Sequence, residues 1–398
     1  METPSRRPSA WRAIIAATVL NLPLGSLYAF SVFLKPLEAM LGLSRAELAL
    51  VFALAAAGFG VGGNVAPHVY ALAPTPVLVL ACATLATLGT ALAATAGGLL
   101  QLAIGYGVCF GAGGGAAYIL AQQAVNLAVT RRRGLVNGYL VGLYPAGAML
   151  AAPVFGWGIR GFGVRVTLGA FAIVLAATGA IGAWLIARSR VTLAGGAATL
   201  TPRETERRRG VFWTLSLVFF LAASAGLMVL GQAAGIIAAY GGAAALAISG
   251  TTFIAATIAV ARLSGGWMVD WLAIPTVAAC AHTVALVGNV ALTLWPGPAI
   301  SVVSLALVGV GYGIISGVTA AAVAVYWRRE LYGFIAGRIY IAWCAAAIVL
   351  PIAAGHLFDV TRSYRTAVLI AAGGNAVGIL VALGLPRVRN LPASKVRA

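Results

Sequence analysis

Arg262 is the residue with the clearest capacity for chemistry, because its charge lies inside a long apolar run. The run is Thr252–Asp270, TFIAATIAVARLSGGWMVD, which is nearly long enough to cross a membrane. An arginine near the middle of a span costs about 2.5–3.5 kcal/mol on insertion scales and is tolerated where it faces a cavity or a partner. At about 1.5 Å per residue, Arg262 lies about 12 Å from Asp270, too far for direct pairing. A fixed positive charge at this depth suits the binding of a small anion.

Three tyrosines fall at the depth of Arg262 in other apolar runs. Counted from the ends of their runs, Tyr118, Tyr144 and Tyr340 are each about 13 Å inside the membrane. A phenol presents an apolar ring and one hydrogen-bonding group, which suits a short-chain carboxylate. Each of them can also be a packing residue. The same two interpretations apply to Gln122, one helical turn beyond Tyr118 on the same face.

The composition identifies a polytopic helical membrane protein. The 398 residues are 62% hydrophobic and 9% charged, with a mean hydropathy of +1.00. The net charge is +18, but the basic residues lie in short loops between apolar runs and form no face for nucleic acid. The four cysteines lie inside apolar runs without metal-ligand spacing. We expect no metal, no cofactor and no nucleic-acid partner, and no enzyme activity, because clustered acids or histidines are missing from the sequence.

Runs of about 20 apolar residues predict an all-α membrane protein with twelve transmembrane helices. The runs lie near 11–34, 48–66, 76–96, 98–127, 135–157, 165–187, 211–233, 244–269, 275–295, 299–326, 331–355 and 364–386. Two of them, 98–127 and 299–326, are long and rich in glycine, and each is a candidate for a break in the helix.

The distribution of basic residues places both termini in the cytoplasm. With the N-terminus inside, nineteen of the 26 Lys and Arg residues fall in cytoplasmic segments and six fall outside. The outside residues are Lys35, Arg45, Arg160, Arg165, Arg362 and Arg365. The basic N-terminal segment leads directly into a span, which favours a cytoplasmic tail over a cleaved signal. We expect a monomeric protein of the plasma membrane, which in a bacterium is the inner membrane.

One long polar connection, 188–210, separates a predicted N-terminal six-helix bundle (1–187) from a C-terminal one (211–398). Sequence features recur between these halves at a nearly constant offset. The pairs are Gly107, Gly111 and Gly115 with Gly309, Gly313 and Gly317, Gly62–Gly63 with Gly265–Gly266, Trp11 with Trp213, Arg132–Arg133 with Arg328–Arg329, and Pro153 with Pro351. The repetition predicts two duplicated bundles. The glycines at every fourth position indicate close helix packing, or smooth faces that allow helices to move.

Several segments resemble the oxalate:formate antiporter group of the major facilitator superfamily, which is close to the monocarboxylate transporters. They are Asn21–Glu38 (NLPLGSLYAFSVFLKPLE), Gly113–Val125 (GGGAAYILAQQAV), Thr130–Gly138 (TRRRGLVNG), Ala261–Asp270 (ARLSGGWMVD) and Tyr332–Trp343 (YGFIAGRIYIAW). In that group an arginine eight residues before the Asp that closes the eighth span pairs with the substrate carboxylate, and Arg262 has this spacing. The resemblance also implies pocket positions for Tyr28, Tyr118 and Tyr340. The alternative for Arg262 is a structural charge paired with a neighbouring span.

The sequence departs from the resemblance in the eleventh span. Oxalate carriers of the group have a second cation there, a lysine, at the position of Trp343. One buried cation leaves the second charge of a dicarboxylate uncompensated, so we expect a monocarboxylate similar to lactate or pyruvate. The resemblance further implies that Asp270 latches the cytoplasmic side, with Arg328 or Arg329 as partner.

The sequence leaves the mode of coupling open. None of the eight acidic residues lies deep in a span, and the Asp that animal monocarboxylate symporters have one turn before the arginine is Ile258 here. His282 can titrate near neutral pH, although a lone histidine is more often a packing residue. Proton symport and anion exchange both fit. The alternative functions are an oxalate:formate-type antiporter and an efflux transporter of amphipathic compounds, the latter on a faint likeness of GAMLAAPVFG within 134–157.

Overall fold

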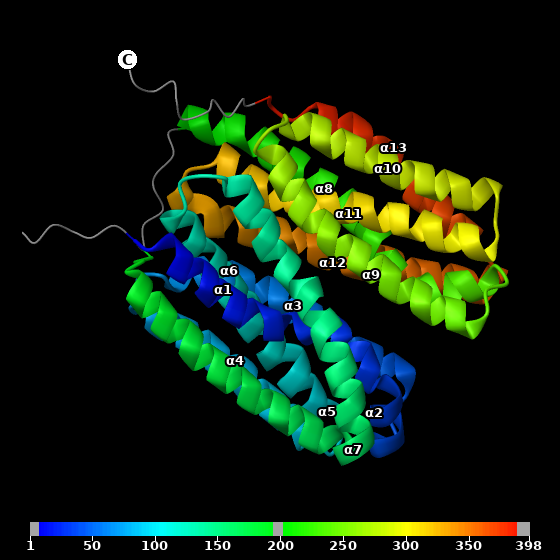
Figure 1. Cartoon of the computed structure of the whole chain (residues 1–398), viewed down its shortest axis with the longest axis horizontal. Coiled ribbons are helices and arrows are strands. Elements are labelled where there is room, and N and C mark those ends of the chain that lie inside the picture. Colours follow the sequence, from blue (N-terminus) through cyan, green and yellow to red (C-terminus); the bar gives the residue numbers. More distant parts are fainter. Residues whose placement is uncertain (1–7, 194–201, 388–398) are drawn as a thin grey trace, which may run out of the picture. The chain divides into compact units, whose positions relative to one another are not determined.

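The computed structural model describes residues 8–193 and 202–387, and all regular elements in this part of the chain are helices (Figure 1). The first elements are α1 (Ala10–Leu24), η1 (Gly25–Phe33), α2 (Leu34–Leu41), α3 (Arg45–Val65), η2 (Ala66–Val69), α4 (Thr75–Ala94), α5 (Leu99–Leu102), η3 (Ala103–Phe110), α6 (Gly111–Ala128) and α7 (Arg133–Ser189). They are followed by α8 (Pro202–Ala239), α9 (Ala244–Val269), α10 (Ile274–Leu294), α11 (Pro298–Tyr326), η4 (Arg329–Leu331), α12 (Tyr332–Thr361) and α13 (Arg365–Leu383).

Parts of two sequence predictions lie outside the described residues. The predicted linker 188–210 includes 194–201, which the structure does not describe. The same is true of the terminal basic residues that contribute to the predicted topology, Arg6, Arg7, Arg389, Lys395 and Arg397.

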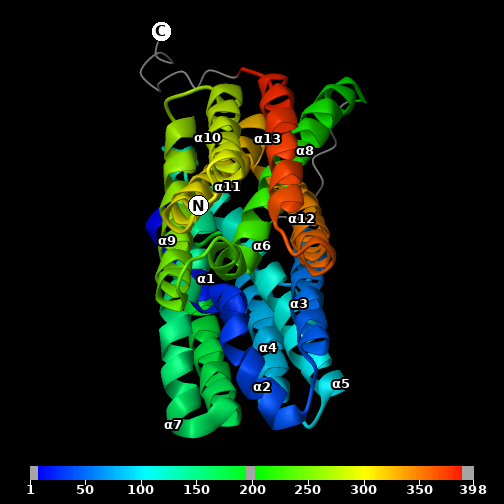
Figure 2. The ribbon, with the colours of Figure 1, turned by 90° about the vertical axis from the view of Figure 1, so that its right-hand side faces the viewer.

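The described helices confirm the membrane-spanning fold. Eleven of them are long and apolar enough to cross a membrane. The longest, α7, has 57 residues, about 85 Å at 1.5 Å per residue, against a hydrocarbon core of about 30 Å. It is interrupted at Gly163, whose φ is 80°. Glycine adopts such a positive φ readily because it has no side chain. Figure 2 shows α7 as two arms joined at one end. The arms match the predicted spans 135–157 and 165–187 and bring the number of spans in the described chain to twelve.

One of the two predicted helix breaks is present. The run near 98–127 contains a π-helical segment, η3, between α5 and α6. The prediction is wrong for the run near 299–326, because α11 is one continuous helix of 29 residues. The first span contains an irregularity that was not predicted. After Pro23, which lacks an N–H and clashes with the preceding turn, the chain continues as the 3₁₀ helix η1.

By contacts, the described chain divides into two compact units that differ from the two sequence halves. The first unit contains 8–131, 143–193 and 329–344, and the second contains 132–142, 202–328 and 345–387. The start of α7 therefore belongs to the second unit and the start of α12 to the first. These starts are equivalent in the internal repeat, since Arg132–Arg133 corresponds to Arg328–Arg329. The six-plus-six division remains a prediction from that repeat.

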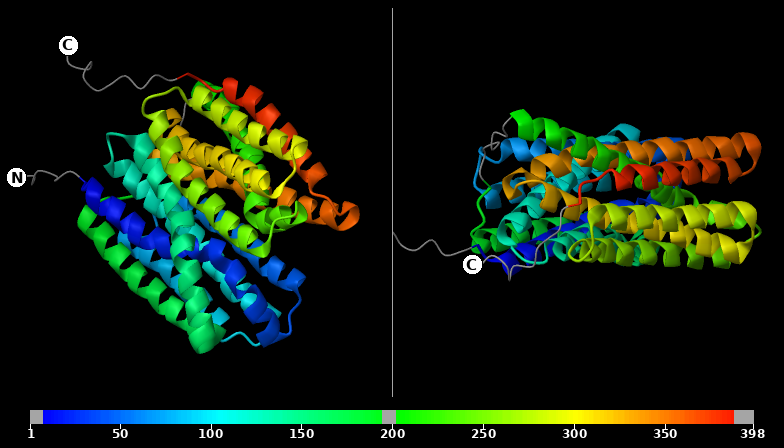
Figure 3. Two further views of the ribbon diagram at one scale, coloured as in Figure 1. Left: turned by 45° about the vertical axis from the view of Figure 1, so that its right-hand side comes forward. Right: turned by 90° about the horizontal axis from the view of Figure 1, so that it is seen from above.

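Each unit has one central helix whose glycines face a neighbour. In the first unit α6 contacts α1, α3 and α4, and a Cβ at Gly111 would lie 2.5 Å from the Ala55 carbonyl oxygen of α3. In the second unit α11 contacts α8, α9 and α10, and a Cβ at Gly313 would lie 2.7 Å from the Ile258 carbonyl oxygen of α9. Figure 3 shows α10 alongside α13 in that unit. The glycine ladders are thus packing surfaces that bring two backbones into contact.

Candidate functional site

Arg262 lies inside α9 and is buried, with 3% of its surface exposed. Its Nη2 donates a hydrogen bond to the Tyr312 hydroxyl at 2.9 Å, and its Nη1 donates to the Val141 carbonyl at 3.2 Å. The guanidinium carbon also lies 5.2 Å from the centre of the Tyr312 ring. These two bonds fix the plane of the guanidinium.

The backbone at Arg262 is clamped between two glycines on neighbouring helices. A Cβ at Gly317 of α11 would overlap the Arg262 carbonyl oxygen, and a Cβ at Gly138 of α7 would lie 2.8 Å from the same oxygen. The contacts join three features that the sequence shows separately: the second glycine ladder, the loop 130–138 and the arginine-bearing span. Because Gly is the residue that allows this approach, the depth and orientation of Arg262 depend on both glycines.

Three of the predicted tyrosines come together in the first unit. The hydroxyls of Tyr118 and Tyr340 share a hydrogen bond of 2.5 Å, and the rings of Tyr118 and Tyr144 lie 4.9 Å apart, edge to face. The Tyr144 hydroxyl donates to the Gly114 carbonyl at 3.3 Å. Such edge-to-face pairs are favoured between aromatic rings. The depth argument from the sequence therefore selected residues that are neighbours in space.

Phe59 lies in the middle of this aromatic cluster. Its ring centre is 5.4–5.9 Å from the rings of the three tyrosines and of Trp343. Tyr28 completes the group, 6.1 Å from Trp343. Phe59 has no signal in the sequence, because a phenylalanine in an apolar run is indistinguishable from a packing residue. Arg262 belongs to the second unit and the cluster to the first, so a cavity shared by both remains a prediction.

Gln122 and Gln123 of α6 contact the start of α12. The Tyr332 hydroxyl donates to Gln122 Oε1 at 2.9 Å, and the Gly333 N–H donates to Gln123 Oε1 at 2.6 Å. Gln123 Nε2 in turn donates to the Arg329 carbonyl at 2.8 Å. Gln122 is thus bonded to Tyr332, and Gln123 caps the N-terminal end of α12, where helix N–H groups lack internal partners.

Asp270, which directly follows α9, caps the start of α7 as Gln123 caps the start of α12. Its two carboxylate oxygens accept the backbone N–H groups of Gly134 and Leu135, at 2.8 and 2.9 Å. A carboxylate at a helix N-terminus satisfies unpaired donors and complements the helix dipole. The described partner of Asp270 is therefore backbone. Its pairing with Arg328 or Arg329 stays a prediction; Arg329 contributes its carbonyl to the contact with Gln123.

The two caps are accompanied by the same close glycine contacts. A Cβ at Gly266 of α9 would lie 2.5 Å from Gly138 Cα of α7. A Cβ at Gly337 of α12 would lie 2.6 Å from the Gly63 carbonyl oxygen of α3. One cap is a charged carboxylate and the other is a neutral amide.

Comparison with known proteins identifies the family. Residues 14–351 match the Major Facilitator Superfamily. The chain belongs to this superfamily. A relative from Escherichia coli (strain K12), the uncharacterized MFS-type transporter YhjX, is 26% identical over 303 residues, which cover 74% of this chain and 75% of that one.

Solved structures of superfamily members share the fold. The proton:xylose symporter XylE has a TM-score of 0.74 at 14% identity and covers 95% of this chain and 96% of its own. The human organic anion transporter MFSD10 has a TM-score of 0.71 at 12% identity, covering 94% of this chain and 100% of its own. FucP in the outward conformation matches with a TM-score of 0.71 at 16% identity, and covers 94% and 100%.

Membership in the Major Facilitator Superfamily decides the class of function. The protein is a multi-pass membrane protein and a secondary active transporter of small solutes, and the superfamily consists of transporters rather than enzymes. This leaves the identity of the solute to the residues of the site.

Two further residues of this Major Facilitator Superfamily transporter were missed in the sequence. Tyr312 bonds Arg262, and its signal is a large polar side chain next to Gly313 of the second glycine ladder. Asn21 of α1 is fully buried, and its amide has no hydrogen-bond partner among the described residues. The signal for Asn21 is an amide inside an apolar run, where polar side chains are rare and often functional.

Proposed function

We propose that the protein transports small organic monocarboxylates by alternating access, with Arg262 as the anion anchor. The observation that carries the proposal is a buried mid-span guanidinium that Tyr312 and Val141 hold in a fixed plane. An arginine inside a span is tolerated where it faces a cavity or a partner, and its guanidinium is suited to binding a carboxylate. Lactate- and pyruvate-like acids fit a site with one such charge.

The guanidinium supports recognition of a carboxylate in particular. Its terminal nitrogens each carry two hydrogens and lie in one plane, so a carboxylate can accept two parallel hydrogen bonds from it. In this mechanism Tyr312 and Val141 fix the plane of the guanidinium. The substrate carboxylate then accepts hydrogen bonds from the guanidinium N–H groups that face the substrate. A lysine offers a point charge without this planar fork.

We assign the remaining polar groups of the site to the rest of the substrate. Tyr118, Tyr144 and Tyr340 form a compact phenol cluster that supplies an apolar wall with hydroxyl groups. Tyr28 and Trp343 extend that wall, and Trp343 stands where a second cation would favour a dianion. Gln122 is the weakest member of the assignment, because its described bond joins it to Tyr332.

We propose that the two helix caps are gate contacts. Asp270 holds the start of α7, and Gln123 holds the start of α12. Breaking them would release two segments that are equivalent in the internal repeat, as alternating access requires. Arg328 and Arg329 are assigned to the same gate, and both termini to the cytoplasmic side of the plasma membrane.

The coupling is either proton symport or exchange of one anion for another. An oxalate:formate-type antiporter is the second candidate, favoured by the resemblance of Asn21–Glu38 and Ala261–Asp270 to that group. Collapsing the pH gradient separates the two modes of coupling, because symport then stops accumulating substrate while exchange against internal anion continues.

A counterflow screen of labelled short carboxylates in proteoliposomes tests the proposal. Monocarboxylates should exchange faster than oxalate or succinate in the wild type. The variant Arg262→Lys should lose this activity, while Arg365→Lys serves as the matched control, because Arg365 is an exposed arginine at the first position of α13. Strong counterflow of dicarboxylates, or activity in Arg262→Lys equal to the control, would contradict the proposal.

A further inference from the structure

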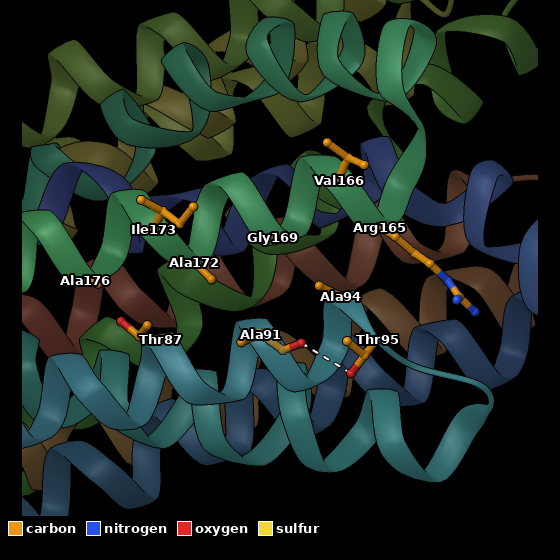
Figure 4. A pocket seen from close by; sticks show the side chains of 10 residues that line it. All are labelled: Thr87, Ala91, Ala94, Thr95, Arg165, Val166, Gly169, Ala172, Ile173 and Ala176. Atoms are coloured by element: carbon orange, nitrogen blue, oxygen red, sulfur yellow. Dashed lines mark hydrogen bonds between the residues drawn. The ribbon is translucent and has the colours of Figure 1, made fainter.

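An apolar groove separate from the site above runs between α4 and the second arm of α7. Its volume is about 560 Å³. Small residues form much of its wall: Ala91, Ala94, Gly169, Ala172 and Ala176 (Figure 4). Both walls belong to the first unit. The groove exists because these positions lack the long side chains that fill the space between most packed helices.

The groove opens onto an apolar surface. Leu88 is 62% exposed, Ile173 72% and Val174 47%. In a multi-pass membrane protein such a surface contacts lipid chains, which are as apolar as leucine. From Arg165 to Ala176 the groove follows eleven residues of helix, or about 16 Å. That length is about half of a hydrocarbon core of about 30 Å, and therefore about one leaflet.

Arg165 gives one end of the groove a positive charge. Figure 4 shows its side chain at the end opposite Ala176. The guanidinium is exposed, and its described hydrogen bond is a long one, 3.4 Å from Nη2 to the Ala96 carbonyl. The sequence contains no Asp or Glu between Glu47 and Glu204, so neither wall helix can neutralise this charge. The apolar groove and its charged end together match an anionic amphiphile.

A second groove lies on the other side of the same arm of α7. It has a volume of about 500 Å³ and shares Val166 with the first. Trp157 and Phe162 line it near the Gly163 turn, and their rings lie 5.5 Å apart, edge to face. Exposed aromatic and basic side chains at one level are typical of the membrane–water interface. The two apolar grooves therefore meet at Val166, the residue next to Arg165.

We propose that the start of the second arm of α7, beside the Gly163 turn, binds one anionic diacyl phospholipid. Its phosphate contacts Arg165, and its two acyl chains lie in the two grooves on either side of Val166. A free phosphate would leave both grooves empty, whereas a diacyl lipid uses the charge and both apolar surfaces. One arginine near a membrane surface contributes about 1 kcal/mol towards an anionic lipid, which corresponds to a preference of about five-fold over a zwitterionic one.

Native mass spectrometry of the full-length, delipidated protein in detergent tests this site. The protein is titrated with phosphatidylglycerol or with phosphatidylcholine, and the affinity of the first bound lipid is compared. Arg165→Gln removes the charge. Gly169→Leu adds a bulky side chain to the wall of the first groove, at a position where a Cβ meets no atom within 4 Å. The matched controls are Arg362→Gln, another exposed arginine, and Gly373→Leu, another helical glycine whose Cβ meets nothing within 4 Å.

The wild type and both controls should bind phosphatidylglycerol about five-fold more tightly than phosphatidylcholine. Arg165→Gln should reduce this ratio to about one, and Gly169→Leu should weaken first binding of both lipids by several-fold. Because Leu favours helix over Gly, loss of folding does not explain a weaker affinity in Gly169→Leu. An unchanged lipid ratio in Arg165→Gln, unchanged affinity in Gly169→Leu, or a dimer mass in place of lipid adducts would overturn the proposal.

Discussion

Replacing Asp270 by Asn tests the helix cap at the start of α7. In the wild type both carboxylate oxygens accept backbone N–H groups, from Gly134 at 2.8 Å and Leu135 at 2.9 Å. An Asn side chain keeps the size of Asp but has one acceptor oxygen, and its NH₂ group would face the second N–H. The substitution therefore removes one charge-assisted hydrogen bond and the interaction of the carboxylate with the helix dipole.

These losses can be given a magnitude. A hydrogen bond to a charged group contributes about 1.5–3 kcal/mol, and a carboxylate at a helix N-terminus about 0.3–1 kcal/mol. We expect Asp270→Asn to destabilise the capped start of α7 by about 2–4 kcal/mol in total. Such a change raises the population in which this segment is open by about 30- to 900-fold.

Hydrogen–deuterium exchange with mass spectrometry measures this opening directly. Peptides that contain Gly134 and Leu135 should exchange faster in Asp270→Asn by a factor within that range, because exchange of protected amides reports local opening. Asp359→Asn is the matched control, since Asp359 is exposed near the end of α12. Equal protection of Leu135 in the wild type and in Asp270→Asn would refute the cap.

Two further predictions concern Arg262 and the aromatic cluster. Gly317→Ala should reduce the initial rate of monocarboxylate uptake at least ten-fold, because its Cβ would overlap the Arg262 carbonyl oxygen and overpacking costs about 1–3 kcal/mol. Gly373→Ala is the control, and equal uptake rates in the two variants would contradict the dependence of Arg262 on Gly317. Trp343→Lys should move counterflow selectivity from monocarboxylates towards dicarboxylates, because it adds the second cation; unchanged selectivity would remove Trp343 from the substrate site.

Hydropathy predicted the spans well because membrane thickness fixes helix length. The run near 244–269 has the bounds of α9, Ala244–Val269. The sequence also indicated that 135–157 and 165–187 are separate spans, and the turn at Gly163 separates them. Interruptions inside spans were harder to predict. Glycine content alone does not distinguish the π-helical η3 from the continuous α11, since both runs carry the same ladder.

The sequence identified single residues of the site better than their partners. Arg262 is conspicuous in the sequence because charge is costly in a span. Tyr312 is identified as its partner only by the way α11 packs against α9. The cap that Gln123 forms was not visible in the sequence, because that contact depends on how the end of α6 packs against the start of α12. The assignment of 132–142 to the second unit and of 329–344 to the first is likewise a result of tertiary packing, which helical periodicity does not encode.

Equilibrium binding of a labelled monocarboxylate to the purified protein tests the role of Arg262 most directly. Loss of one of two parallel charge-assisted hydrogen bonds should weaken binding to Arg262→Lys by about ten- to a hundred-fold. Arg365→Lys should bind as the wild type does. If Arg262→Lys binds the monocarboxylate as tightly as the wild type, the guanidinium does not hold the substrate.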